Sequence, residues 1–174
     1  MRNSKMKGFT LIELIVVIAI IGVLAAILVP SMLGYVRNAR ISSANANAKQ
    51  VHTAISSTLT QLGISNYDFG TTGSSLNTVI VELSGNKIAC TWDTTNKPTD
   101  DKTDVISYLG ENFTGKGKAW FNKATYSVSY AAWASDSTAQ TKAFALTSPV
   151  GPTQQKKDAK DGAIYGCYPQ GEDS

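Results

Sequence analysis

Residues 7–30 read KGFTLIELIVVIAIIGVLAAILVP, and the fold of the chain depends on this stretch. Residues 9–29 are an apolar run of 21 residues with one charged side chain, Glu13. As a helix, the run is roughly 31 Å long, close to the ~30 Å hydrocarbon core of a bilayer. The cations Arg2, Lys5 and Lys7 precede it, and such cations stay on the cytoplasmic side. The sequence therefore predicts a membrane-spanning helix followed by an extracytoplasmic region.

Glu13 separates three interpretations of this apolar run. An ordinary secretory signal peptide has an apolar region of about 7–15 residues, which is shorter than the run here. A plain membrane anchor explains the length of the run but leaves the carboxylate unexplained. A carboxylate at membrane depth costs roughly 2.5–3.5 kcal/mol, and such residues are by default functional. We favour a helix that both spans the membrane and assembles through Glu13, although the residues alone leave the other two interpretations open.

The motif KGFTLIE at residues 7–13 resembles the class III signal peptide of type IV prepilins. The continuation LIVVIAIIGVLAAILVP is similar to the N-terminal helix of type IVa-like pilins. This resemblance implies a leader peptide, residues 1–8, which a prepilin peptidase cuts after Gly8 before it methylates the new amino terminus of Phe9. It also implies that Glu13 neutralises the terminal amine of a neighbouring subunit. Pairing offsets part of the cost of burying each of these charges and fixes the register between subunits.

The same resemblance implies an α+β fold, in which a long N-terminal helix packs on an antiparallel sheet. It implies a major pilin that polymerises with itself into a type IV pilus, driven by an inner-membrane assembly machinery with its ATPase. Such filaments serve adhesion, surface motility or biofilm formation. The precursor would lie in the cytoplasmic membrane and the assembled subunit in a pilus on the bacterial surface. A minor pilin, or a type II secretion or competence pseudopilin, is the alternative within this machinery, and an anchored binding module is the alternative outside it.

Gly22 and Pro30 are two further matches to the pilin helix. Glycine weakens a helix interior, and proline removes one hydrogen bond and clashes with the preceding turn. The resemblance implies that the stretch between them unwinds in assembled filaments. A mild kink without further consequence is the other interpretation.

Beyond Pro30 the pattern becomes amphipathic. One apolar stripe recurs at steps of three and four residues, as on a helix face: Ala44, Ala48, Val51, Ile55, Leu59 and Leu62. Gly63 follows as a candidate C-cap. We therefore expect one helix over residues 9–62, with a filament-core half at 9–30 and an amphipathic half at 31–62. The amphipathic half needs a partner surface, which a β-sheet would supply.

Residues 63–174 are expected to form the globular part, which begins with a loop over residues 63–73. The segment 76–83 is ambiguous between a strand and a short helix. Strands are predicted at 87–92, 125–133 and 142–146, with an edge strand at 162–168. A short helix is predicted at 105–109, and loops at 94–103 and 156–161, the latter because it mixes both signs of charge.

The charge distribution argues against nucleic-acid binding by bulk charge. The formal net charge of +3 equals the three cations of residues 1–8, and without these 13 basic residues face 13 acidic ones. A nucleic-acid-binding protein would keep a basic patch. We therefore expect no nucleic-acid partner.

Few residues suit catalysis or metal binding. The single histidine, His52, is interpreted as an ordinary helix residue, and no cluster has zinc-ligand spacing. Asp100, Asp101 and Asp104 are interpreted as an exposed acidic loop rather than a calcium site. We expect no enzymatic activity, cofactor or metal. Cys90 and Cys167 permit one disulfide in an exported domain, and two buried thiols are the alternative.

Overall fold

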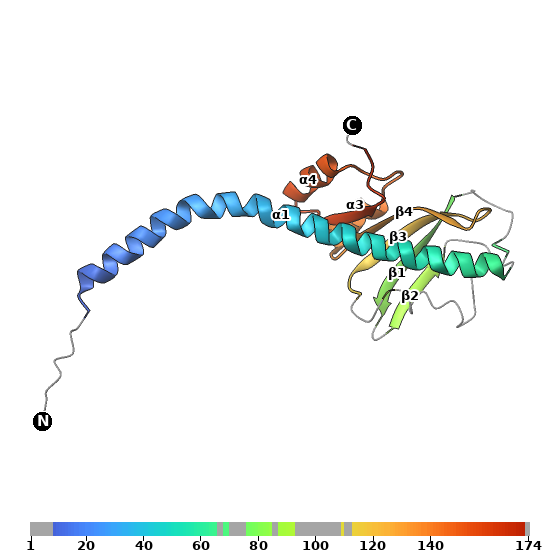
Figure 1. The fold of residues 1–174 in the computed structure, drawn as a ribbon, viewed down its shortest axis with the longest axis horizontal. Coiled ribbons are helices and arrows are strands. Elements are labelled where there is room, and N and C mark those ends of the chain that lie inside the picture. The colour runs from blue at the N-terminus through green and yellow to red at the C-terminus, as the bar shows by residue number, and fades with distance from the viewer. Residues whose placement is uncertain are drawn as a thin grey trace, which may run out of the picture. The chain divides into compact units, whose positions relative to one another are not determined.

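The computed structural model describes residues 9–65, 68–69, 76–84, 87–92, 109 and 113–172. In chain order these residues form α1 (Leu11–Ile64), β1 (Leu76–Ser84), β2 (Lys87–Trp92), β3 (Lys116–Asn122), β4 (Ser127–Ala134), α3 (Ser137–Phe144), α4 (Pro152–Lys160) and β5 (Tyr165–Tyr168). The strands make one antiparallel sheet of order β2-β1-β3-β4-β5 (Figure 1). The expected α+β class, a long helix packed on an antiparallel sheet, is confirmed.

The chain divides into two compact units, Met1–Val36 and Arg37–Ser174. In the first unit, α1 is helical from Leu11 onward and continues without a break through Gly22 and Pro30. Ser31 Oγ donates a hydrogen bond to the Leu28 carbonyl at 2.8 Å, beside the proline. The continuous helix belongs to a single copy of the chain, so it does not test the expected unwinding in a filament.

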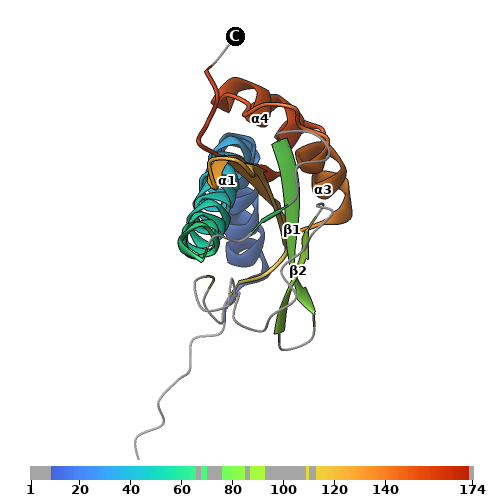
Figure 2. The same ribbon diagram turned by 90° about the vertical axis from the view of Figure 1, so that its right-hand side faces the viewer.

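In the second unit, α1 covers one face of the sheet. Its buried residues include the whole predicted apolar stripe, together with Ile41, Ala54 and Thr58. They pack against the β1, β3 and β4 residues Val79, Val81, Ala119, Phe121, Ala131 and Trp133. The opposite face of the sheet carries a second cluster, in which Trp120, Tyr130 and Ala132 pack with Ala139 and Ala143 of α3. Figure 2 shows α1 and α3 on opposite faces of the sheet.

Two glycines bring α1 close to the sheet. A Cβ atom built on Gly166 would lie 1.9 Å from the Ala44 carbonyl oxygen, and one on Gly117 would lie 2.5 Å from a Val51 methyl carbon. Real Cβ atoms essentially never approach so closely. A side chain at Gly166 would therefore force the backbones of β5 and α1 apart.

The structure corrects three predictions. Residues 142–146 are not a strand, because α3 extends to Phe144, and Asp136 begins it by accepting a hydrogen bond from the Ala139 N–H at 2.8 Å. Residues 156–161 are not a solvated loop, because α4 runs to Lys160 and buries Asp158. Gly63 is not a C-cap, because α1 continues through it to Ile64. One strand, β3, was not predicted at all.

The other predictions of local structure have mixed outcomes. The ambiguous segment 76–83 is strand β1, the strand at 87–92 is β2, and the strand at 125–133 corresponds to β4. The edge strand is confirmed as β5, which begins at Tyr165 rather than at Gly162. The predicted loop at 94–103 and most of the predicted helix at 105–109 lie outside the described residues.

Candidate functional site

The first turn of α1 is closed by a capping box made of Thr10 and Glu13. The backbone N–H and the hydroxyl of Thr10 both donate to Oε2 of Glu13, at 2.8 and 2.6 Å. In return, the Glu13 N–H donates to the Thr10 hydroxyl at 3.3 Å. This is the reciprocal arrangement of a T-x-x-E sequence, which satisfies two backbone donors that a helix start otherwise leaves unpaired.

The capping box fixes the Glu13 carboxylate next to the start of the helix. Both bonds to the carboxylate end on Oε2, so in the described part of the chain Oε1 is left to accept from another group. The positive end of the helix dipole also favours an anion at this position. The carboxylate is thus held beside Phe9, the residue that would carry a new amine after cleavage, and it keeps an acceptor for a cation.

The flank of this capping box is an exposed apolar surface. Every residue from 9 to 33 is exposed, with large apolar side chains from Phe9 at 76% to Val17 at 47%. The helix is long and apolar enough to cross a membrane, and its most apolar stretch of 18 residues has no part buried inside the protein. Exposed apolar surface of this extent marks a site of contact with a membrane or another protein.

The predicted site residues lie in different places. Phe9 immediately precedes Thr10 and Glu13, whereas Gly8 lies outside the described residues. Gly22 and Pro30 lie further along α1. A Cβ atom on Gly22 would meet nothing within 4 Å, so neither packing nor a turn accounts for this glycine within one copy of the chain.

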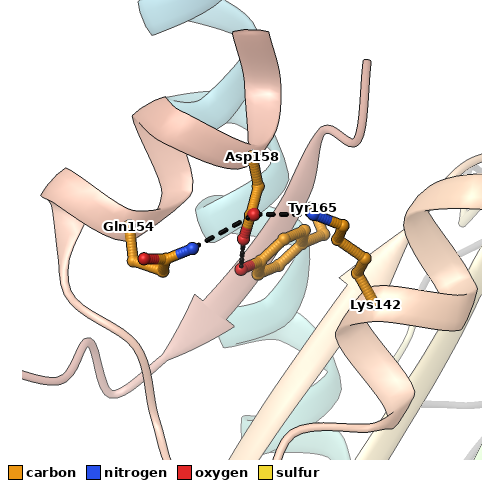
Figure 3. Close-up of polar contacts among 4 residues, drawn as sticks. All are labelled: Lys142, Gln154, Asp158 and Tyr165. Atoms are coloured by element: carbon orange, nitrogen blue, oxygen red, sulfur yellow. Dashed lines mark hydrogen bonds and ion pairs between the residues drawn. The ribbon is translucent and has the colours of Figure 1, made fainter. Parts of the chain in front are cut away.

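The structure also assembles a polar cluster that the sequence did not reveal. Asp158 of α4 accepts hydrogen bonds from Tyr165 Oη at 2.6 Å, Lys142 Nζ at 2.9 Å and Gln154 Nε2 at 3.1 Å (Figure 3). Asp158 is 6% exposed and Tyr165 is 2% exposed. The cluster therefore joins α3, α4 and β5 through one buried carboxylate.

Burial and hydrogen bonding act oppositely on Asp158. Burial alone raises the pKa of its carboxyl group, but the hydrogen bonds from Tyr165, Lys142 and Gln154 together outweigh it and hold the pKa below its ordinary value. For Tyr165, burial and then the bond to Asp158 both raise the pKa. The cluster thus contains an ionised aspartate and a neutral tyrosine at neutral pH.

An amide pair attaches the same helix to α1. Asn45 Oδ1 accepts from Gln155 Nε2 at 2.8 Å and from the Cys167 N–H at 2.9 Å. Gln155 Nε2 also donates to the Tyr165 carbonyl at 3.2 Å. Because β5 is an edge strand, these bonds satisfy backbone groups that face away from β4, and they close this edge to further strands.

The permitted disulfide between Cys90 and Cys167 is not formed. Cys90 lies on β2 and Cys167 on β5, the two opposite edges of the sheet. Four strand spacings of about 4.8 Å separate them by roughly 19 Å, whereas a disulfide needs Cα atoms within about 7 Å. Cys167 is a buried thiol whose pKa burial raises to about 11. The alternative of a buried thiol therefore holds for Cys167.

His52 and the acidic residues complete the survey of predicted positions. His52 is partly buried on α1, with its ring edge-on to Tyr168 at 5.1 Å between centroids, and burial lowers its pKa. Among the described residues no group of three or more His, Cys, Asp or Glu side chains is placed to hold a metal ion. The acidic cluster at Asp100, Asp101 and Asp104 lies outside those residues.

Comparison with known proteins finds similarity in the N-terminal part of the chain. Residues 3–29 match the family model of the prokaryotic N-terminal methylation motif. The type IV major fimbrial protein FimA of Dichelobacter nodosus is 46% identical over 57 residues, 33% of this chain and 36% of the relative. The type IV major pilin protein PilA of Myxococcus xanthus is 46% identical over 52 residues, 30% of this chain and 24% of the relative. No solved structure matches the chain.

A third relative matches over a longer stretch. The type II secretion system core protein G of Pseudomonas aeruginosa is 30% identical over 93 residues, 53% of this chain and 63% of the relative. The chain spans 36% of the length of FimA and 24% of the length of PilA. These relatives are named as structural components of pili or a secretion system, not as enzymes. Residues 3–29 thus match the prokaryotic N-terminal methylation motif, and the N-terminal third of the chain is similar to type IV pilins.

Proposed function

We propose that this protein is the precursor of a major pilin, a structural subunit that polymerises into a type IV pilus. The observation that carries the proposal is a fully exposed apolar helix whose first turn holds a capped carboxylate, Glu13. Exposing a helix of this kind to water costs free energy, because its surface is apolar. A membrane would cover this surface in the precursor, and the helices of other subunits would cover it in the filament. The relatives' names support self-assembly into filaments.

The proposed sequence of events begins in the cytoplasmic membrane. The leader, residues 1–8, faces the cytoplasm, where a prepilin peptidase cuts after Gly8 and methylates the amine of Phe9. Glu13 then accepts the amine of a neighbouring subunit, and an assembly machinery with its ATPase moves the subunit into the filament. The helix of residues 9–30 becomes the filament core, and the pilus on the cell surface supports adhesion, surface motility or biofilm formation.

The capping box supports this role for Glu13. In a single copy, the two hydrogen bonds from Thr10 offset part of the cost of holding a carboxylate at the membrane. A neighbouring amine adds a charge-assisted bond at Oε1 without breaking the cap, and such bonds are about twice as strong as neutral ones. The carboxylate therefore keeps its bonds to Thr10 and gains in the filament a cationic partner at Oε1.

The stretch between Gly22 and Pro30 is proposed to unwind on assembly. Gly22 has room for a Cβ atom in the single chain, so Gly22→Ala should leave insertion unchanged and strengthen the helix by about 0.5–1 kcal/mol. If unwinding accompanies assembly, the variant should give fewer filaments than the wild type. Filament yield equal to that of the wild type would contradict the unwinding but not the pilin role.

The pseudopilin alternative is supported by the longer match to core protein G. Deleting the gene and quantifying the surface filaments separates the two roles. A major pilin should make up most of the protein in sheared filaments, and its loss should remove the filaments from the cell surface. Intact filaments combined with a loss of protein secretion would instead support the secretion-system role.

A further inference from the structure

The length of α1 locates its first basic residues relative to a membrane. Arg37 comes 28 residues after Phe9, which as a helix corresponds to about 42 Å. A bilayer with its headgroup layers is about 40–45 Å thick. If the apolar segment spans the membrane, as the proposed function requires, Arg37 reaches the outer headgroup layer, and Arg40 follows one turn later. Tyr35, 75% exposed, has the position of an interfacial aromatic residue.

The fold brings a second group of cations to the same level of α1. Lys156 of α4 lines a groove with Asn38, Ser42 and Asn45 of α1, and the Asn45–Gln155 amide pair holds α4 in this place. Three lysines of α4 are exposed: Lys156, Lys157 and Lys160. They are 116 or more residues away from Arg40 in sequence, so the place of α4 beside the start of the second unit is a product of the fold.

The nearby acidic residues leave these cations in excess. Asp158 forms an ion pair with Lys142, and the two charges cancel, so the pair adds no net charge to the surface. Asp136 shares a groove with Arg40, Asp161 caps α4, and Glu172 is exposed near the start of that helix. Five cations thus face three carboxylates at this end of the second unit.

We propose that Arg37, Arg40, Lys156, Lys157 and Lys160 form a basic collar that binds the phosphate groups of anionic phospholipids on the outer surface of the cytoplasmic membrane. Basic side chains within a Debye length of an anionic surface are attracted to it. The collar would hold the globular part against the membrane until the subunit is extracted. A lipid partner fits because Arg37 and Arg40 of the collar follow the apolar segment directly in the chain.

The test compares the full precursor in nanodiscs of phosphatidylglycerol with the same chain in nanodiscs of phosphatidylcholine. Lysine acetylation rates are measured residue by residue with mass spectrometry. Lys156, Lys157 and Lys160 should be acetylated about fivefold more slowly beside the anionic lipid. Lys123 is the internal control, because it lies far from the collar. It is three residues before Tyr126, whose ring lies against Gly63 at the far end of α1. Gly63 is roughly 39 Å from Arg37 along the helix. Its acetylation rate should not change.

A variant separates the collar from a general effect of the lipid. With Lys156, Lys157 and Lys160 all replaced by Gln, hydrogen exchange of α4 amides should be the same in both nanodiscs, whereas Lys123→Gln should retain the wild-type difference. Equal acetylation rates of the collar lysines in both lipids would overturn the collar. Protection of these lysines by contacts between protein copies would be the same in both lipids, and that result would overturn the collar too. Failure of the chain to enter either nanodisc would instead contradict the membrane role in the proposed function.

Discussion

At the scale of single residues, Glu13 has a partner within its own chain. Its carboxylate accepts two hydrogen bonds from Thr10. The carboxylate in the apolar segment therefore has polar contacts even before a neighbouring subunit binds. The motif T-x-x-E in the sequence is itself the pattern of a capping box, whereas the resemblance to pilins implies only the intersubunit pairing. The two roles make different demands on Thr10 and on Glu13.

Replacing each residue separates capping from charge pairing. Thr10→Ala removes the capping hydroxyl, which is worth about 1 kcal/mol, but leaves the carboxylate. Glu13→Gln keeps an acceptor for the cap and removes the charge. We expect Glu13→Gln to lose most filaments and Thr10→Ala to retain them, as measured by the protein in sheared surface fractions. Loss of filaments in Thr10→Ala together with retention in Glu13→Gln would instead assign the requirement to the cap.

Gly166 is a second residue on which the structure makes a sharp demand. Gly166→Ala would place a Cβ atom 1.9 Å from the Ala44 carbonyl oxygen, a backbone atom that cannot rotate away. We expect a loss of stability of about 1–3 kcal/mol or more, as for overpacking. Thermal unfolding followed by tryptophan near-ultraviolet circular dichroism in detergent micelles measures it. Gly34→Ala, which meets no atom within 4 Å, should not lower the midpoint.

At the scale of elements, α4 depends on the ionisation of Asp158. The folded state lowers the pKa of this carboxyl group, so its contribution to stability is present above its unfolded pKa of about 3.9 and is lost as pH falls through the lower folded pKa. We expect the stability of the wild type to fall between about pH 5 and pH 2. Asp158→Asn should lower stability at pH 7 and flatten this dependence.

Asp161 provides the matched control for Asp158. It lies three residues further along, at the C-cap of α4, and is exposed. Asp161→Asn should therefore keep both the stability at pH 7 and its fall in acid. A wild-type profile in Asp158→Asn would show that the cluster does not couple α4 to its neighbours.

The amide pair makes a separate prediction for β5. Asn45→Ala leaves the Cys167 N–H without its acceptor in a buried setting and removes one of the two acceptors of Gln155 Nε2, which should cost about 1–3 kcal/mol. Hydrogen exchange at the Cys167 amide should accelerate more than at the β3 amides. Asn38→Ala, at an exposed position on the same helix, is the control and should change neither quantity.

The elements predicted from the sequence are those with a strong apolar pattern. The stripe of α1 was readable because apolar residues mark its buried face. Strand β4 was readable because its residues alternate between the cluster under α1, which contains Trp133, and the cluster under α3, which contains Tyr130. Strand β3 was missed because its face toward α1 carries Gly117 and Ala119, which are small so that α1 can approach. Helices α3 and α4 were missed because alanines and hydrogen-bonded polar groups, rather than an apolar stripe, attach them.

At the scale of the whole molecule, the predictable and unpredictable parts of the site differ in kind. Glu13, Gly22 and Pro30 share one helix and Phe9 lies just before it, so their pattern was recognisable. The Asp158 cluster and the Asn45–Gln155 pair join residues up to 110 positions apart, and only the folded sheet brings them together. The separation of Cys90 and Cys167 likewise follows from strand order, which the sequence did not reveal.

The central claim is that residues 9–30 anchor the precursor and then form the core of a filament. Tandem mass spectrometry of the N-terminal peptide from sheared surface filaments tests it most directly. The predicted result is a peptide that begins at Phe9, with a methylated amine and the apolar segment retained. A peptide that begins after residue 29, as an ordinary signal peptide would leave, or an intact Met1, would contradict the claim.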